Sequence, residues 1–173
     1  AAKEHPDWCA TDIEGNPYVI VPGELYNSCL MGGYYTDYGF KMLRELLTRY
    51  DPDGIQLNNF GFTGKGLCYC PRCREDFQQT YGAEIPAKKD WNDPVFRQFL
   101  RWREEKTNEG AARMRKMVKD VRPDLPFMGN SACFGDPGWV LGSSIDKEGV
   151  AEFEDIVKVE AQTRIKTNID QDQ

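Results

Sequence analysis

The chain has 173 residues, 40% of them hydrophobic and 29% charged, which is typical of a globular domain with its own core. Its 22 basic and 28 acidic residues give a net charge of -6, which argues against a nucleic-acid partner because such partners need a basic footprint. No apolar run approaches the roughly 20 residues of a membrane span, and a single histidine, His5, argues against histidine-based catalysis. We lean towards a cytoplasmic location, and secretion stays open because a mature chain has lost its signal peptide.

Residues 1–35 are expected to form a long loop, a kind of segment that is usually functional in a compact domain. Within it, residues 18–21 read as a short strand of a small hairpin that Pro22 and Gly23 end. Glu24 and Tyr26 are candidate ligand contacts on this loop. The alternative for both is an ordinary solvated surface.

Residues 36–50 have the apolar spacing of a helix that Thr36 or Asp37 caps. The stripe expected to face the core consists of Phe40, Leu43, Leu46, Leu47 and Tyr50. A DPDG turn then leads into a short strand over residues 55–58.

Two more helices follow, each with its own boundary signals. Pro71 can start the first and Gly82 can end it, while Asn92 or Asp93 caps the second, long helix, which Pro123 stops. Strands are expected at residues 127–130 and 156–160, and residues 161–173 form a polar tail.

Alternating strands and helices predict an α/β fold with a parallel sheet. We interpret the whole chain, residues 1–173, as one segment: a loop (1–35), βα units (36–160) and the tail. A (β/α)₈ TIM barrel needs about 250 residues, so the chain is expected to be an incomplete barrel of that type.

Three predicted strands end in a polar residue: Asn58, Asn130 and Glu160. At the carboxyl ends of parallel strands these side chains would meet at one mouth, together with Asn59. The alternative is that strands simply end in polar residues. Trp139, in the loop 131–150, could stack on a sugar or cover the end of the barrel.

Three of the six cysteines fall within six residues, as Cys68, Cys70 and Cys73. This spacing suits thiolate ligation of a zinc-like ion, completed by Cys29 or Cys133. A disulfide to a distant cysteine and plain buried thiols stay open as alternatives.

Several motifs in order resemble one enzyme family over residues 5–164. They are HPDW, YDPDGI, CYCPRC, YGAEIP, the W-x-D-P of residues 91–94, FLRWR, VRPDLP and VEAQTR. Together they resemble glycoside hydrolases related to the α-L-fucosidase-like TIM barrels. The resemblance implies a (β/α)₈ barrel of which this chain is the middle, and hydrolysis of a glycosidic bond.

Such hydrolysis normally uses two carboxyl groups that face the same bond. Glu160 is the first candidate, as general acid/base, because it ends a strand on the side expected to face the mouth. The resembled family often has Asp where this chain has Asn58, so the second carboxylate is sought at Glu24 or Asp37, or outside these residues.

The remaining site predictions concern the sugar and the metal. Asn58, Asn59, Asn130, Trp139 and Tyr26 are expected to contact the sugar, and Arg164 to hold a carboxylate or an acidic sugar. The chemistry needs no cofactor, and a structural zinc is expected at Cys29, Cys68, Cys70 and Cys73.

Other readings of the whole chain remain. One is a non-catalytic carbohydrate-binding relative, and another is a small metal-stabilised interaction module. The expected partners are a carbohydrate substrate and either a second copy of the chain or the rest of the barrel.

Overall fold

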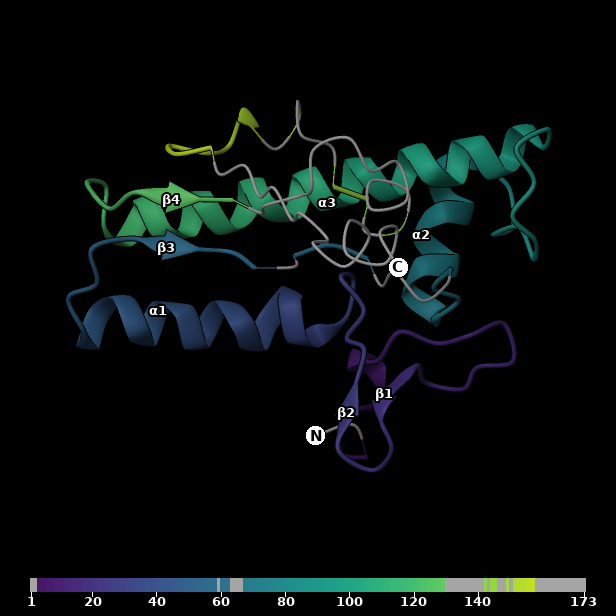
Figure 1. Cartoon of the computed structure of the whole chain (residues 1–173), viewed down its shortest axis with the longest axis horizontal. Helices are drawn as coiled ribbons and strands as arrows, with labels where there is room; N and C mark the ends of the chain where they lie inside the picture. Colours follow the sequence, from purple (N-terminus) through teal and green to yellow (C-terminus); the bar gives the residue numbers. More distant parts are fainter. Residues whose placement is uncertain are drawn as a thin grey trace, which may run out of the picture.

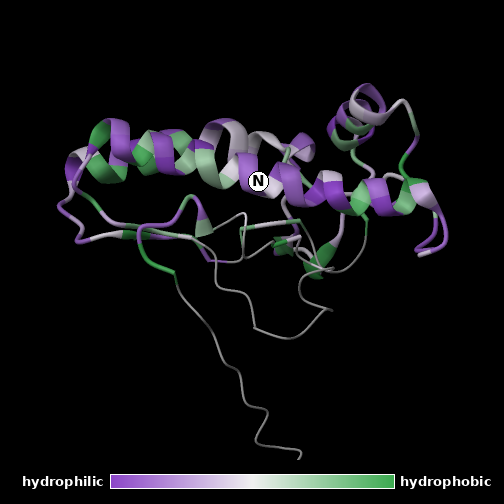
Figure 2. Ribbon diagram, turned by 90° about the horizontal axis from the view of Figure 1, so that it is seen from above, coloured by the Kyte–Doolittle hydropathy of each residue, from purple (hydrophilic) through white to green (hydrophobic). Residues whose placement is uncertain are grey.

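A computed structural model describes residues 3–58, 60–62, 67–129, 142, 144, 145, 149 and 151–157. Its main body has two layers, a small parallel sheet and the helices that cover one face of it (Figures 1 and 2). An antiparallel hairpin and the N-terminal residues lie beside this body, near the start of α1 (Figure 1). The fold therefore consists of an α/β layer and a hairpin region beside it.

The α/β layer contains two strands and two helices. Strand β3 (Ile55–Gln56) pairs in parallel with β4 (Phe127–Met128), so that Ile55 lies opposite Phe127. Helix α1 (Gly39–Arg49) precedes β3, helix α3 (Pro94–Val121) precedes β4, and the two helices contact each other. A single parallel bridge from Met128 to Ile156 adds a third chain segment to the sheet. The predicted parallel pairing is therefore present, although the strands are shorter than expected.

The hairpin region begins with a short 3₁₀ helix, η1 (Pro6–Trp8). Strands β1 (Val19–Val21) and β2 (Leu25–Tyr26) form the antiparallel hairpin, as the sequence predicted for residues 18–21. Two hydrogen bonds tie this region to the segment before α2 (Pro71–Tyr81): Tyr18 donates to the Leu67 carbonyl at 2.9 Å, and the Tyr69 amide donates to the Thr11 carbonyl at 2.9 Å.

Local chemistry sets the ends of α2 and α3 as predicted. Pro71 occupies the first turn of α2, where a missing N–H costs nothing. Gly82 ends α2 in the left-handed conformation at φ 66°. Asp93 caps α3 by accepting a hydrogen bond from the Val95 amide at 2.8 Å.

The start of α1 differs from the prediction. The chain coils from Tyr34 onward as a π-helical turn, η2 (Tyr34–Tyr38), that continues directly into α1. The Thr36 hydroxyl donates to the Gly32 carbonyl and Asp37 pairs with Lys41, so neither side chain caps the helix.

The predicted buried stripe of α1 is also wrong in part. Leu47 is buried, whereas Leu46 is 38% exposed and Tyr50 is 69% exposed. Tyr38, Met42, Leu46 and Tyr50 follow one another at intervals of four residues on the outer side of the helix. Periodicity predicted the helix correctly but did not separate its inner apolar face from this outer one.

The core lies where α2 crosses α3. Phe77, Phe99 and Trp102 are fully buried, with Phe77 and Phe99 packed edge to face at 5.4 Å between centroids. Trp102 also packs on the neighbouring helix: its ring lies 5.7 Å from that of Phe77, and its indole N–H donates to Asp76 at 2.6 Å.

The strands of the described residues form two two-stranded sheets and no closed barrel. No helix in this part of the chain is both long and apolar enough to cross a membrane.

Candidate metal centre

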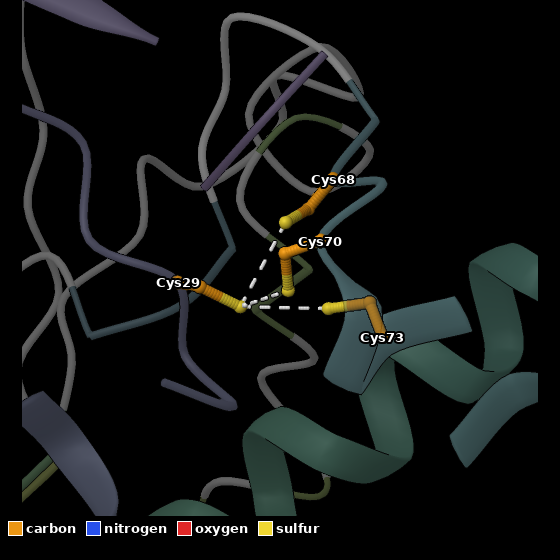
Figure 3. A group of neighbouring side chains, drawn as sticks. All are labelled: Cys29, Cys68, Cys70 and Cys73. Carbon is orange, nitrogen blue, oxygen red and sulfur yellow. Dashed lines mark hydrogen bonds between the residues drawn. The ribbon is translucent and has the colours of Figure 1, made fainter. Parts of the chain in front are cut away.

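Four cysteines from two distant stretches point their sulfur atoms at one another (Figure 3). Cys29 follows β2 in the hairpin region. Cys68 and Cys70 lie in the extended segment before α2, and Cys73 lies in its first turn. Pro71 starts the helix between the last two, so the turn of α2 brings Cys73 back towards Cys70. The site therefore joins the hairpin region to the α/β layer.

The sulfur atoms have the spacing of a tetrahedral site. Cys29 Sγ lies 3.4 Å from Cys73 Sγ, 3.5 Å from Cys70 Sγ and 3.7 Å from Cys68 Sγ. All four sulfur atoms lie within 4.8 Å of one another. Zinc–sulfur bonds of about 2.3 Å in a tetrahedron place the sulfur atoms about 3.8 Å apart. The four side chains thus fit a small thiophilic ion with little movement.

The same distances do not fit a disulfide. A disulfide needs about 2.05 Å between its sulfur atoms, and these cysteines are free thiols. All four are buried. Cys133, the alternative fourth ligand, lies outside the described residues, and Cys29 takes that place in the cluster.

Hydrogen bonds among the sulfur atoms shift the pKa values of the thiols in opposite directions. The hydrogen bond with Cys29 is the main cause that lowers the pKa of Cys70. The hydrogen bond with Cys68 raises the pKa of Cys29, and the one with Cys29 raises the pKa of Cys73. Four thiolates this close repel one another, so a fully ionised cluster needs a cation at its centre.

Arg103 supplies a buried positive charge near this cluster. Its side chain is 2% exposed, lies over the Phe62 ring at 5.3 Å, and donates to the Gly142 carbonyl at 2.6 Å. Burial lowers the pKa of the guanidinium to about 10, and negative charge on Cys68 and Cys73 acts in the opposite direction. Arg103 is therefore charged at neutral pH.

A backbone amide also contacts the cluster. The Met31 amide donates to Cys29 Sγ at 3.3 Å. Donors and charges of this kind around a metal site orient its ligands and tune their basicity. That Arg103 and Met31 lie beside the cysteines was not predicted, because this proximity depends on packing between segments that are distant in the sequence.

The other predicted site residues that the structure describes do not belong to the cysteine cluster. Glu24 is exposed in the hairpin turn, and Tyr26 is half-buried in β2. Both line one hollow together with Trp8. Asn58 is exposed just after β3 and is not among the residues that line this hollow. Asn59, Asn130, Trp139, Glu160 and Arg164 lie outside the described residues.

Comparison with known proteins gives structural neighbours only. No family model matches the chain, and no curated protein sequence matches it. Among solved structures, a β-galactosidase from Bacillus circulans sp. alkalophilus superposes with a TM-score of 0.70 and 19% identity, covering 95% of this chain and 28% of the other. A β-galactosidase from Halorubrum lacusprofundi gives 0.72 and 14%, covering 99% and 30%.

An α-L-fucosidase isoenzyme 2 from Paenibacillus thiaminolyticus is also similar, with a TM-score of 0.55, 22% identity, and coverage of 88% of this chain and 20% of the other. The chain thus spans less than a third of the length of these proteins. At such identities the likeness concerns the fold. These neighbours are TIM-barrel glycosidases, and this chain is similar to a portion of them.

Proposed function

We propose that this chain is part of a TIM-barrel glycoside hydrolase that hydrolyses a glycosidic bond in a carbohydrate. The single observation that carries the proposal is the superposition on a β-galactosidase over 99% of the chain at a TM-score of 0.72. The parallel β3–β4 pair, with a helix before each strand, supports it, since that order is the repeating unit of such barrels.

Glu160 is proposed as the general acid/base, from its place at the end of the strand predicted for residues 156–160. Glu24 is proposed as the second carboxylate, because the loop that bears it is one where a sugar could bind. Sugar contacts are proposed from the sequence at predicted strand ends and in the segments that follow them, at Asn58, Asn59, Asn130, Trp139 and Arg164.

The four clustered cysteines are proposed to hold a structural zinc ion. A closed set of four thiolates leaves no open position for a substrate or water, which is the arrangement of structural rather than catalytic zinc. The ion would lock Cys29 onto the first turn of α2, and the charge of Arg103 would offset part of the net charge of about -2 on a zinc–tetrathiolate group.

The test is a screen of the native gene product that contains these residues. It uses chromogenic β-D-galactosides and α-L-fucosides, the sugars in the names of the neighbours. Glu160→Gln should abolish turnover and leave sugar binding intact. The matched control, Glu152→Gln, alters an exposed carboxylate outside the predicted strand end and should leave turnover unchanged.

The outcomes separate the alternatives. Binding of sugar without turnover by the parent protein would indicate a non-catalytic carbohydrate-binding relative. Neither binding nor turnover, in a protein that contains zinc, would leave only a metal-stabilised module. Equal turnover in parent and Glu160→Gln would remove Glu160 from the mechanism.

A further inference from the structure

A hollow of about 770 Å³ opens between the hairpin and the start of α1. Three segments within residues 3–38 line it: the N-terminal residues up to Cys9, the hairpin from Gly23 to Tyr26, and η2 with Tyr34 and Tyr38. The volume lies within the range of roughly 300–1,000 Å³ that is typical of small-molecule sites.

Aromatic rings form one wall of this hollow. The Trp8 ring lies 5.7 Å from Tyr34 and 5.3 Å from Tyr38, centroid to centroid, and the two tyrosines are 5.9 Å apart. Tyr38 is 47% exposed, so much of its surface is open to a ligand. The wall therefore offers apolar ring surface on the solvent side.

The backbone holds this wall in place. A Cβ atom at position 33 would lie 2.6 Å from Trp8 Nε1, closer than real Cβ atoms approach, so the tryptophan fits only because Gly33 is there. The His5 ring stacks on Trp8, with 3.9 Å between the ring centroids and 7° between the ring planes. A wall fixed before the ligand arrives costs little ordering entropy when the ligand binds.

Polar groups complete the lining. Glu24 offers carboxylate oxygens that accept hydrogen bonds, and Tyr26 and Ser28 offer hydroxyl groups that donate or accept. A few polar groups beside aromatic surface suit a molecule with one apolar face and a polar rim. A pyranose ring is such a molecule, because its C–H groups gather on a face and its hydroxyl groups surround it.

We propose that this hollow binds a pyranose unit of a carbohydrate, with the ring against Tyr38 and the hydroxyl groups bonded to Glu24 and Tyr26. The proposal rests on the proposed function for the choice of a carbohydrate, and it adds the residues that recognise it. A folded protein partner is a poorer fit, since the lining mixes carboxylate and hydroxyl groups with the rings rather than forming an extended apolar face.

The test measures binding of methyl β-D-galactopyranoside and of L-fucose by saturation-transfer NMR with the intact protein. Tyr38→Ala should raise the dissociation constant about tenfold, as truncation of a central aromatic contact does. Tyr50→Ala is the matched control, because Tyr50 is an equally large ring that directly follows α1, is 69% exposed, and does not line the hollow. Glu24→Gln, in an exposed turn, is a second variant that leaves the fold untouched and should also weaken binding.

Each result decides the matter. Equal dissociation constants in the parent, Tyr38→Ala and Glu24→Gln overturn the hollow as the sugar site, while turnover of chromogenic glycosides by the parent would still uphold the proposed function. A parent that neither binds these sugars nor cleaves glycosides overturns both. A change in sedimentation on Tyr38→Ala, without sugar binding, would make the hollow an interface between copies and also overturn the proposal.

Discussion

Substitution of Cys29 tests the metal centre most directly, because this residue alone joins the hairpin region to the cluster. The other three cysteines lie within six residues of one another. The contact between Cys29 and Cys73 closes a loop of 44 residues. A metal ion that binds both thiolates in the folded chain and is released on unfolding stabilises the fold by its own binding free energy.

The size of the effect follows from the zinc affinity that the fourth thiolate completes. A folded site with free zinc at about 1,000 times its dissociation constant gains about 4 kcal/mol over a chain that no longer binds the ion. For a protein of 150–250 residues, each kcal/mol moves the melting temperature by about 2–4 °C. Cys29→Ser should therefore melt about 8–16 °C below the parent at that zinc concentration.

The assay is thermal unfolding followed by circular dichroism, with and without a zinc chelator, and with metal content measured by mass spectrometry. Cys9→Ser is the matched control, because Cys9 is also buried, at 5% exposure, and lies outside the cluster. In chelator every protein lacks the bound ion, so the gap between the two variants should disappear. The reasoning fails if that gap is absent with zinc, or if chelator leaves it unchanged.

Three further changes test the fold around the site. Asp155→Asn should destabilise the protein by breaking the ion pair with Lys119 at 2.6 Å, as chemical denaturation at pH 7 would measure. The hydrogen bond with Lys119 is the main cause that lowers the pKa of Asp155 from 3.8 to about 2. The stabilisation by Asp155 is therefore present above pH 4 and is lost as the pH falls towards 2. The same difference in stability between parent and variant at pH 2 and pH 7 would contradict this account. Asp93→Ala should cost about 1 kcal/mol in urea denaturation by removing the cap on the Val95 amide, and an unchanged midpoint would show that the cap adds nothing. Gly82→Ala should also lower the urea midpoint, because a side chain is strained at φ 66°, whereas a rise would mean that the loss of unfolded-state entropy dominates.

The parts of the fold that the sequence predicted depend on chemistry between near neighbours. Pro71, Gly82 and Asp93 mark the ends of helices because each acts on backbone groups within a few residues of itself. The close spacing of Cys68, Cys70 and Cys73 indicated a shared site for the same reason. Whether Cys29 or Cys133 joined them depended on how distant segments pack, and spacing along the chain does not contain that information.

The wrong predictions also come from packing at long range. Leu46 and Tyr50 have the spacing of core residues, but the sheet and α3 cover a different side of α1. Arg103 shares the helical period of the core residues and is indeed buried, although its charge would ordinarily place it at the surface. Its burial is explained by partners that are distant in the sequence, the thiols and the Gly142 carbonyl around it.

The cysteine cluster and the hollow share the hairpin region, so the position of one affects the other. Strand β2 carries Tyr26 into the hollow, and the chain reaches Cys29 three residues later. From Cys29 the chain continues through Gly32 and Gly33 to Tyr34 and Tyr38, which form the aromatic wall. Cys29 therefore lies, along the chain, between the strand on one side of the hollow and the tyrosines on the other. A bond that holds its sulfur atom would restrict the movement of both sides. A metal ion at this position would order a hollow that it does not touch, which gives a physical reason for a closed four-thiolate centre in a protein whose proposed chemistry needs no metal.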